Sequence, residues 1–71
     1  MIERRFHKEL YAPAAVQGAV DAFARFAQIE LSDEGDYRVV RVSARRPERE
    51  RKVAQELGNF AFGLSRKEGL A

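Results

Sequence analysis

The sequence predicts a two-layer α+β fold, in which one three-stranded sheet carries two helices on the same face. Apolar residues alternate with polar ones near the N-terminus and again in the middle of the chain, as in half-buried strands. Two longer segments carry apolar residues at helical spacing, and each begins with a proline. Because these patterns follow the order β-α-β-β-α, we expect an incomplete ferredoxin-like fold, which lacks the last strand of the β-α-β-β-α-β repeat.

The chain of 71 residues has room for one small domain, spanning residues 1–71. A single hydrophobic core of this size supplies only about 3 to 5 kcal/mol of folding stability, so a further source of stability is expected. There is no cysteine for a disulfide or a thiolate metal site, and the single histidine, His7, cannot form a histidine-rich site. We therefore expect a homodimer without a metal or other cofactor.

The N-terminus is charged and lacks the apolar segment of a signal peptide. No run of apolar residues reaches the length of about 18 that a membrane-spanning helix needs. A cysteine-free composition fits a reducing compartment. These features predict a soluble cytoplasmic protein that does not use a membrane as a partner.

The first strand is expected to run from Ile2 to Leu10, with Phe6 on the same side as both ends. Arg4 and Lys8 fall on this apolar side as well. Either a bulge shifts the register, or the two side chains run their aliphatic stems along the core and keep their charges in water. We favour the second interpretation, which requires an edge strand.

The first helix should begin at Pro13 and end near Gln28. Gly18 lies inside it and weakens the helix by about 1 kcal/mol relative to alanine. Close approach of a neighbouring backbone would account for its presence.

A hairpin follows, with a short strand Ile29–Leu31, a turn over Ser32–Asp36 and a longer strand Tyr37–Ser43. Gly35 can adopt a positive φ in the turn. The three acids there lack the spacing of a calcium-binding loop. In a split β-α-β arrangement the first strand pairs beside the third, which gives the strand order 2-3-1.

The side chains of the third strand alternate between the two faces of the sheet. Val40 and Val42 should point to the helices, and the outer face would carry Tyr37, Val39 and Arg41, together with Arg5, His7 and Tyr11. An aromatic and basic face can bind a peptide or single-stranded RNA. It can equally be an ordinary solvated sheet face, which we slightly favour.

The second helix should begin around Pro47 and stop at Gly69. Phe62 lies off its apolar stripe and is a contact candidate. The expected core combines the stripes of both helices with the third strand: Phe23, Phe26, Val40, Val42, Val53, Leu57, Phe60 and Leu64.

The segment Arg45–Lys52 carries five basic residues against two acids, although the net charge of the chain is only +2. It could meet phosphate or an acidic partner. The same pattern is typical of the solvated start of a helix, in which Glu48 and Lys52 form a favourable pair. Nucleic-acid binding is disfavoured because the motifs specific to such modules are missing. The candidate partner surface comprises Tyr37, Arg41, Phe62, Arg45, Arg46 and Arg49.

An enzyme is not expected. Ser32, Ser43 and Ser65 have no nucleophile-elbow context, and there is no glycine-rich phosphate loop. So short a chain can hardly enclose a cleft for a pair of catalytic carboxylates. We therefore assign no catalytic residue.

Four parts of the chain resemble HxsD-like proteins: the run Phe6–Val16, the helix rich in alanine and phenylalanine after it, the acidic turn before Tyr37–Val40, and the late segment Glu56–Ala61. The resemblance implies a small accessory protein of the His-Xaa-Ser peptide-maturation systems, acting beside radical-SAM enzymes that modify a ribosomally made peptide. It implies no catalytic residue. Three functions thus stay open: an accessory module that binds a peptide or partner protein, a nucleic-acid-binding domain, and a homodimeric structural protein.

Overall fold

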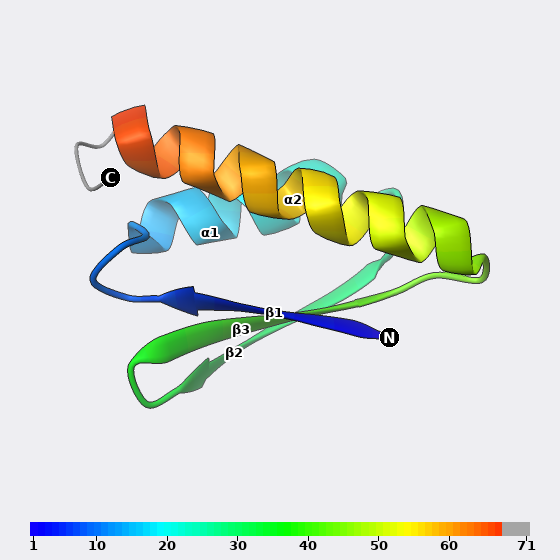
Figure 1. Cartoon of the computed structure of the whole chain (residues 1–71), viewed down its shortest axis with the longest axis horizontal. Coiled ribbons are helices and arrows are strands. Elements are labelled where there is room, and N and C mark those ends of the chain that lie inside the picture. The colour runs from blue at the N-terminus through cyan, green and yellow to red at the C-terminus, as the bar shows by residue number, and fades with distance from the viewer. Residues whose placement is uncertain (68–71) are drawn as a thin grey trace.

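The computed structural model describes residues 1–67 and contains the predicted β-α-β-β-α order (Figure 1). Its elements are β1 (Ile2–His7), α1 (Pro13–Phe23), β2 (Gln28–Glu34), β3 (Tyr37–Ser43) and α2 (Pro47–Lys67). Both helices lie on one face of the sheet, so the two-layer α+β fold is confirmed. The helix end predicted at Gly69 lies outside the described residues. No helix within residues 1–67 has the length and apolar composition needed to cross a membrane.

The sheet is antiparallel, with the strand order β1-β3-β2 that the sequence predicted. Val42 of β3 lies between Ile2 of β1 and Ile29 of β2. β1 is therefore an edge strand, as the positions of Arg4 and Lys8 required. It is shorter than expected, because the chain turns after His7: the amide nitrogens of Leu10 and Tyr11 both donate to the carbonyl of His7 at 3.0 Å.

The hairpin turn is tighter than the sequence suggested. β2 continues through Glu34, so only Gly35 and Asp36 connect it to β3. Gly35 has φ 62°, and a positive φ at the first central residue is typical of a type II′ turn. The strand extends through its acidic end because Arg38 of β3 holds Asp33 with an Nη1–Oδ1 distance of 3.3 Å.

α1 begins at Pro13 as predicted but ends at Phe23, before the expected Gln28. The chain must reverse there to reach β2, and residues 24–26 form a turn in which the amide nitrogen of Phe26 donates to the carbonyl of Phe23 at 3.0 Å. Phe26 therefore leaves the helical stripe.

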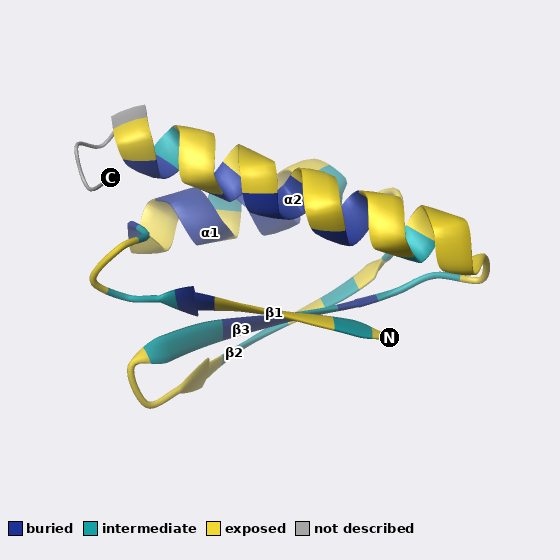
Figure 2. Ribbon diagram, viewed as in Figure 1, coloured by how far each residue is buried: buried dark blue, intermediate teal, exposed yellow. Residues whose placement is uncertain are grey.

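The core lies between the sheet and both helices (Figure 2). Its buried members are Phe6, Val16, Ala19, Val20, Val40, Val42, Val53, Ala54, Leu57 and Ala61. Four predicted members are confirmed, namely Val40, Val42, Val53 and Leu57, whereas Phe23 and Leu64 are only half-buried.

Two predicted core residues are wrong: Phe26 is 44% and Phe60 is 42% exposed. The small residues Ala54 and Ala61 of α2 are buried in the core, whereas these two large rings remain partly in solvent.

Gly18 does mark a close approach, but the neighbour is a side chain and not a backbone. A Cβ at Gly18 would lie 3.2 Å from Cδ1 of Leu64 in α2. Gly63, by contrast, has open space around the position of a Cβ.

We expect Gly63→Ala to raise the free energy of unfolding by about 0.5 to 1 kcal/mol, because alanine favours a helix interior and meets no neighbour here. Thermal unfolding followed by circular dichroism measures the change. Gly18→Ala is the matched variant, and it should raise the free energy of unfolding by less, because the side chain of Leu64 must shift. A larger gain at Gly18 would contradict the packing of α1 on α2.

Candidate functional site

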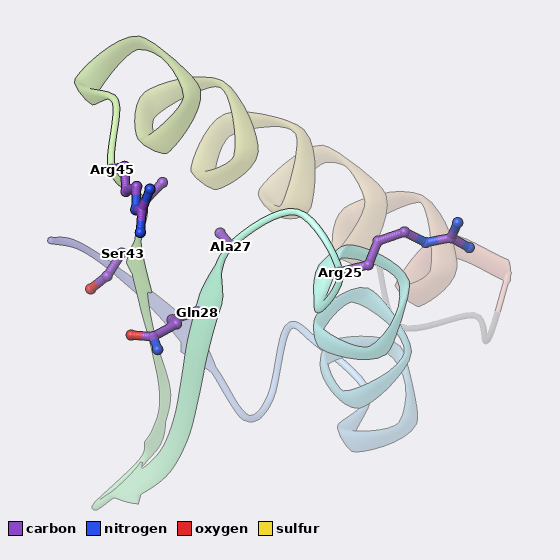
Figure 3. A pocket seen from close by; sticks show the side chains of 6 residues that line it. Arg25, Ala27, Gln28, Ser43 and Arg45 are labelled. Carbon is purple, nitrogen blue, oxygen red and sulfur yellow. The ribbon is translucent and has the colours of Figure 1, made fainter.

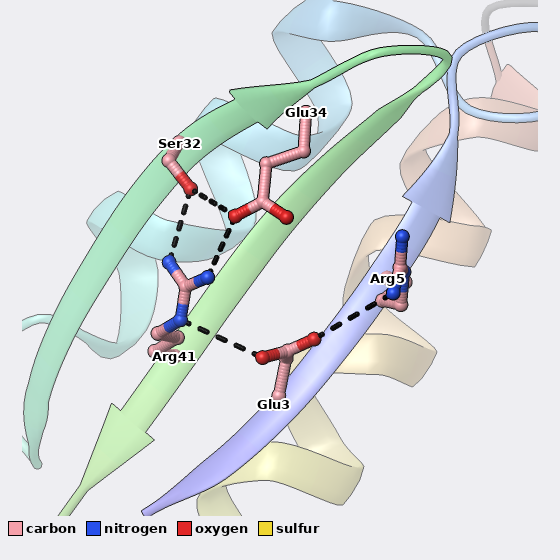
Figure 4. Close-up of polar contacts among 5 residues, drawn as sticks. All are labelled: Glu3, Arg5, Ser32, Glu34 and Arg41. Carbon is pink, nitrogen blue, oxygen red and sulfur yellow. Dashed lines mark hydrogen bonds and ion pairs between the residues drawn. The ribbon is translucent and has the colours of Figure 1, made fainter.

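The open face of the sheet carries a polar network centred on Arg41 (Figure 4). Its guanidinium donates from Nη2 to Oε2 of Glu34 at 2.6 Å and from Nη1 to Oγ of Ser32 at 3.1 Å. Nε also lies 3.5 Å from Oε1 of Glu3. The hydrogen bond from Arg41 holds the pKa of Glu34 below its ordinary value, and the same bond raises the pKa of Arg41. Arg41 is thus occupied within the chain.

Tyr37 lies on the same face and is half-buried. The guanidinium carbon of Arg5 sits 5.0 Å from its ring centroid, and the ring of His7 meets it edge to face at 5.0 Å. Tyr11, expected on this face, packs instead against Phe6 and the core. With its ring in contact with Arg5 and His7, Tyr37 makes a poor stacking platform, which favours an ordinary solvated sheet face.

His7 and the serines lie apart within residues 1–67. The Nδ1 atom of His7 accepts a hydrogen bond from the amide of Glu9 at 3.1 Å. The hydroxyl of Ser32 contacts Arg41, and the buried hydroxyl of Ser65 accepts from the amide of Ala12 at 3.3 Å. No hydrogen bond joins His7 to a serine in this part of the chain, and we assign no nucleophile and base here.

Arg45, Arg46 and Arg49 surround the start of α2. Arg45 lines a hollow of about 610 Å³ at the open end of β2 and β3; Arg25 also lines it, but its guanidinium points away from Arg45 (Figure 3). Arg45, Arg46 and Arg49 together line a neighbouring hollow of about 490 Å³. The two hollows share Arg45, and the surface formed by Arg45, Arg46 and Arg49 is here called the basic surface.

A third hollow, of about 290 Å³, lies between the helices and is here called the helix groove. Its lining residues are Phe23, Phe26, Arg49, Lys52, Val53 and Glu56. The ring of Phe23 lies 6.2 Å from that of Phe26 and meets Phe60 edge to face at 5.9 Å. Arg49 belongs to the groove and to the basic surface, so an apolar floor adjoins a basic rim.

The basic side chains of this surface are not paired within residues 1–67. No ion pair there includes Arg45, Arg46 or Arg49, and none joins Glu48 to Lys52 as the sequence suggested. Glu50 is occupied elsewhere, because its carboxylate contacts the N-terminal amine at 2.7 Å and accepts from the amide of Ala44 at 3.3 Å. These contacts lower the pKa of Glu50, with the N-terminal amine as the larger cause.

Phe62 lies apart from the helix groove. It is 45% exposed, and the guanidinium carbon of Arg66 sits 5.8 Å from its ring. Gly58, one turn earlier on the same side of α2, faces Arg4 of β1. Phe62 is therefore on the side of α2 that meets β1.

The candidate residues thus separate into three places: the open sheet face, the start of α2 and the outer side of α2 near β1. The sequence missed Phe26 as a surface residue and the half-buried Phe23 as a residue of the groove, because helical spacing assigned both to the core.

The structure defines a small α+β domain with an apolar groove between its helices and a basic rim. Comparisons with family models, with curated proteins and with solved structures give no match to the chain.

Proposed function

We propose that this chain is a non-catalytic accessory module that binds a peptide or a partner enzyme. A resemblance to HxsD-like proteins supports a role in a radical-SAM peptide-modification system. The observation that carries the proposal is the helix groove, whose apolar floor adjoins arginines at the start of α2 that form no ion pair within residues 1–67.

The groove favours a particular ligand chemistry. Phe23, Phe26 and Val53 offer an apolar floor for one side chain, and such buried anchors dominate binding energy. Arg49 and Lys52 on the rim attract carboxylates on either side of that anchor. The fitting ligand is a short acidic segment that carries one apolar or aromatic residue.

The same surface fits a nucleic acid less well. Base stacking needs a free aromatic face, whereas the guanidinium of Arg25 lies 5.7 Å from the ring centroid of Phe26. A peptide is therefore the ligand that we favour.

We expect a fluorescent peptide with one phenylalanine flanked by aspartates to bind the full chain, and Phe26→Ala and Arg49→Ala each to weaken binding about tenfold. Fluorescence anisotropy gives the dissociation constants. Arg51→Ala is the matched control, since Arg51 is exposed on the same helix but does not line the groove. It should leave the affinity nearly unchanged.

If Arg49→Ala and Arg51→Ala weakened peptide binding equally, the peptide would be held by general charge attraction and not by a defined site. That result would contradict the proposal. Tighter binding of single-stranded RNA, falling steeply with salt, would support the nucleic-acid alternative instead. The link to peptide modification is tested by mixing the chain with a purified radical-SAM enzyme of such a system. We expect a complex in size-exclusion chromatography that Phe26→Ala weakens.

A further inference from the structure

β2 is a regular edge strand with free backbone groups. The amide of Lys8 donates to the carbonyl of Asp36 at 2.9 Å, which fixes the alternation of hydrogen-bonded pairs along the sheet. By this alternation the N–H and C=O groups of Ile29, Leu31 and Asp33 point away from β3. Within residues 1–67 nothing pairs with that side of β2.

Edge strands are usually kept from pairing with another chain by charged residues, lysine above all, by prolines or by bulges. The sequence of β2 contains no lysine, arginine or proline, and its register with β3 runs without a break. Two of its acids are neutralised from within the chain, since Asp33 contacts Arg38 and Lys8, and Glu34 contacts Arg41. β1 differs, because Arg4 and Arg5 lie along its edge.

The charges of β2 are self-complementary in an antiparallel pair centred on Leu31. Leu31 then lies opposite itself, Ile29 opposite Asp33, Glu30 opposite Ser32, and Gln28 opposite Glu34. No like charges face each other directly. The corresponding pairing of β1 about Arg5 would place Arg5 against itself.

We infer that two copies of this chain pair through β2 about a two-fold axis at Leu31. The product is a continuous six-stranded antiparallel sheet with all four helices on one face, since the axis is perpendicular to the sheet. Half-buried Leu31 meets its counterpart at the centre. The inference does not rest on the proposed peptide binding, which uses a different surface.

Two substitutions at one position test the register of the pairing. For each variant, sedimentation equilibrium of the full chain gives the dissociation constant of the dimer. Ser32→Glu places a carboxylate opposite Glu30 of the partner subunit, and symmetry repeats the repulsion. We expect the constant to rise about threefold to tenfold. Ser32→Lys creates two attractive pairs and should lower it by a similar factor. Both variants remove the same hydroxyl, so they control for each other, and circular dichroism checks that both fold.

A monomer at every concentration would overturn the inference, as would equal responses of the two Ser32 variants. A dimer strengthened by Arg5→Ser would use the β1 edge, because that change removes the repulsion between arginines. A dimer dissociated by Phe62→Glu would pack through the outer side of α2, where the sequence made Phe62 a contact candidate. Either result would also exclude pairing through β2.

Discussion

Phe6→Ala is expected to leave most of the chain unfolded at 25 °C. Phe6 is only 3% exposed, and its ring packs edge to face on Tyr11 with centroids 4.9 Å apart. Removing such a ring costs about 3 to 5 kcal/mol, which is comparable with the stability of about 3 to 5 kcal/mol expected for a core of this size. Far-UV circular dichroism and urea titration measure the loss.

Leu10→Ala is the control for this experiment, since Leu10 is 57% exposed and follows β1 in the same chain segment. It should change the free energy of unfolding by less than about 1 kcal/mol. Comparable losses at Phe6 and Leu10 would contradict the strand end at His7. They would favour the longer strand, reaching Leu10, that the sequence suggested.

Leu57→Ala should destabilise the chain by about 2 to 5 kcal/mol. Leu57 is fully buried in the middle of α2, where the helix packs on the sheet. The cavity left behind cannot close easily, because the surrounding residues include rigid valines of β3. Urea denaturation at constant temperature gives the free energy, with an unchanged m-value if only stability is altered.

Phe60→Ala tests the helix face assigned by the structure. Phe60 is one turn from Leu57 but 42% exposed, so its loss should cost only about 1 kcal/mol. The apolar spacing of the sequence alone would predict equal losses of stability for both residues. A loss at Phe60 as large as that at Leu57 would mean that α2 is rotated relative to the sheet.

The order of elements could be predicted because it depends on local patterns. Pro13 and Pro47 mark both helix starts, and alternation located the strand Tyr37–Ser43 with its correct bounds. The strand order followed from a general rule of connection. The end of α1 could not be found in this way, since the apolar spacing continues through Phe26 and gives no sign of the turn at residues 24–26.

The candidate site was predicted only in part, for a similar reason. Arg45, Arg46 and Arg49 were found because a dense basic segment is visible in the sequence. Arg41 is occupied by Glu34 and Glu3, which come from two other strands, and only the strand register brings these charges together. The helix groove also depends on how α1 meets α2, so neither spacing nor composition could indicate it.

The two strand pairs of the sheet differ greatly in the sequence separation between their strands. β2 and β3 are joined by a two-residue turn, whereas β1 and β3 come from opposite halves of the chain. A hairpin forms on the order of 1 to 10 μs, but docking β1 requires closing a long loop and comes at a greater cost in entropy. We therefore expect β1 to join the sheet late in folding. Amides of β1 should then exchange with solvent earlier than those shared by β2 and β3.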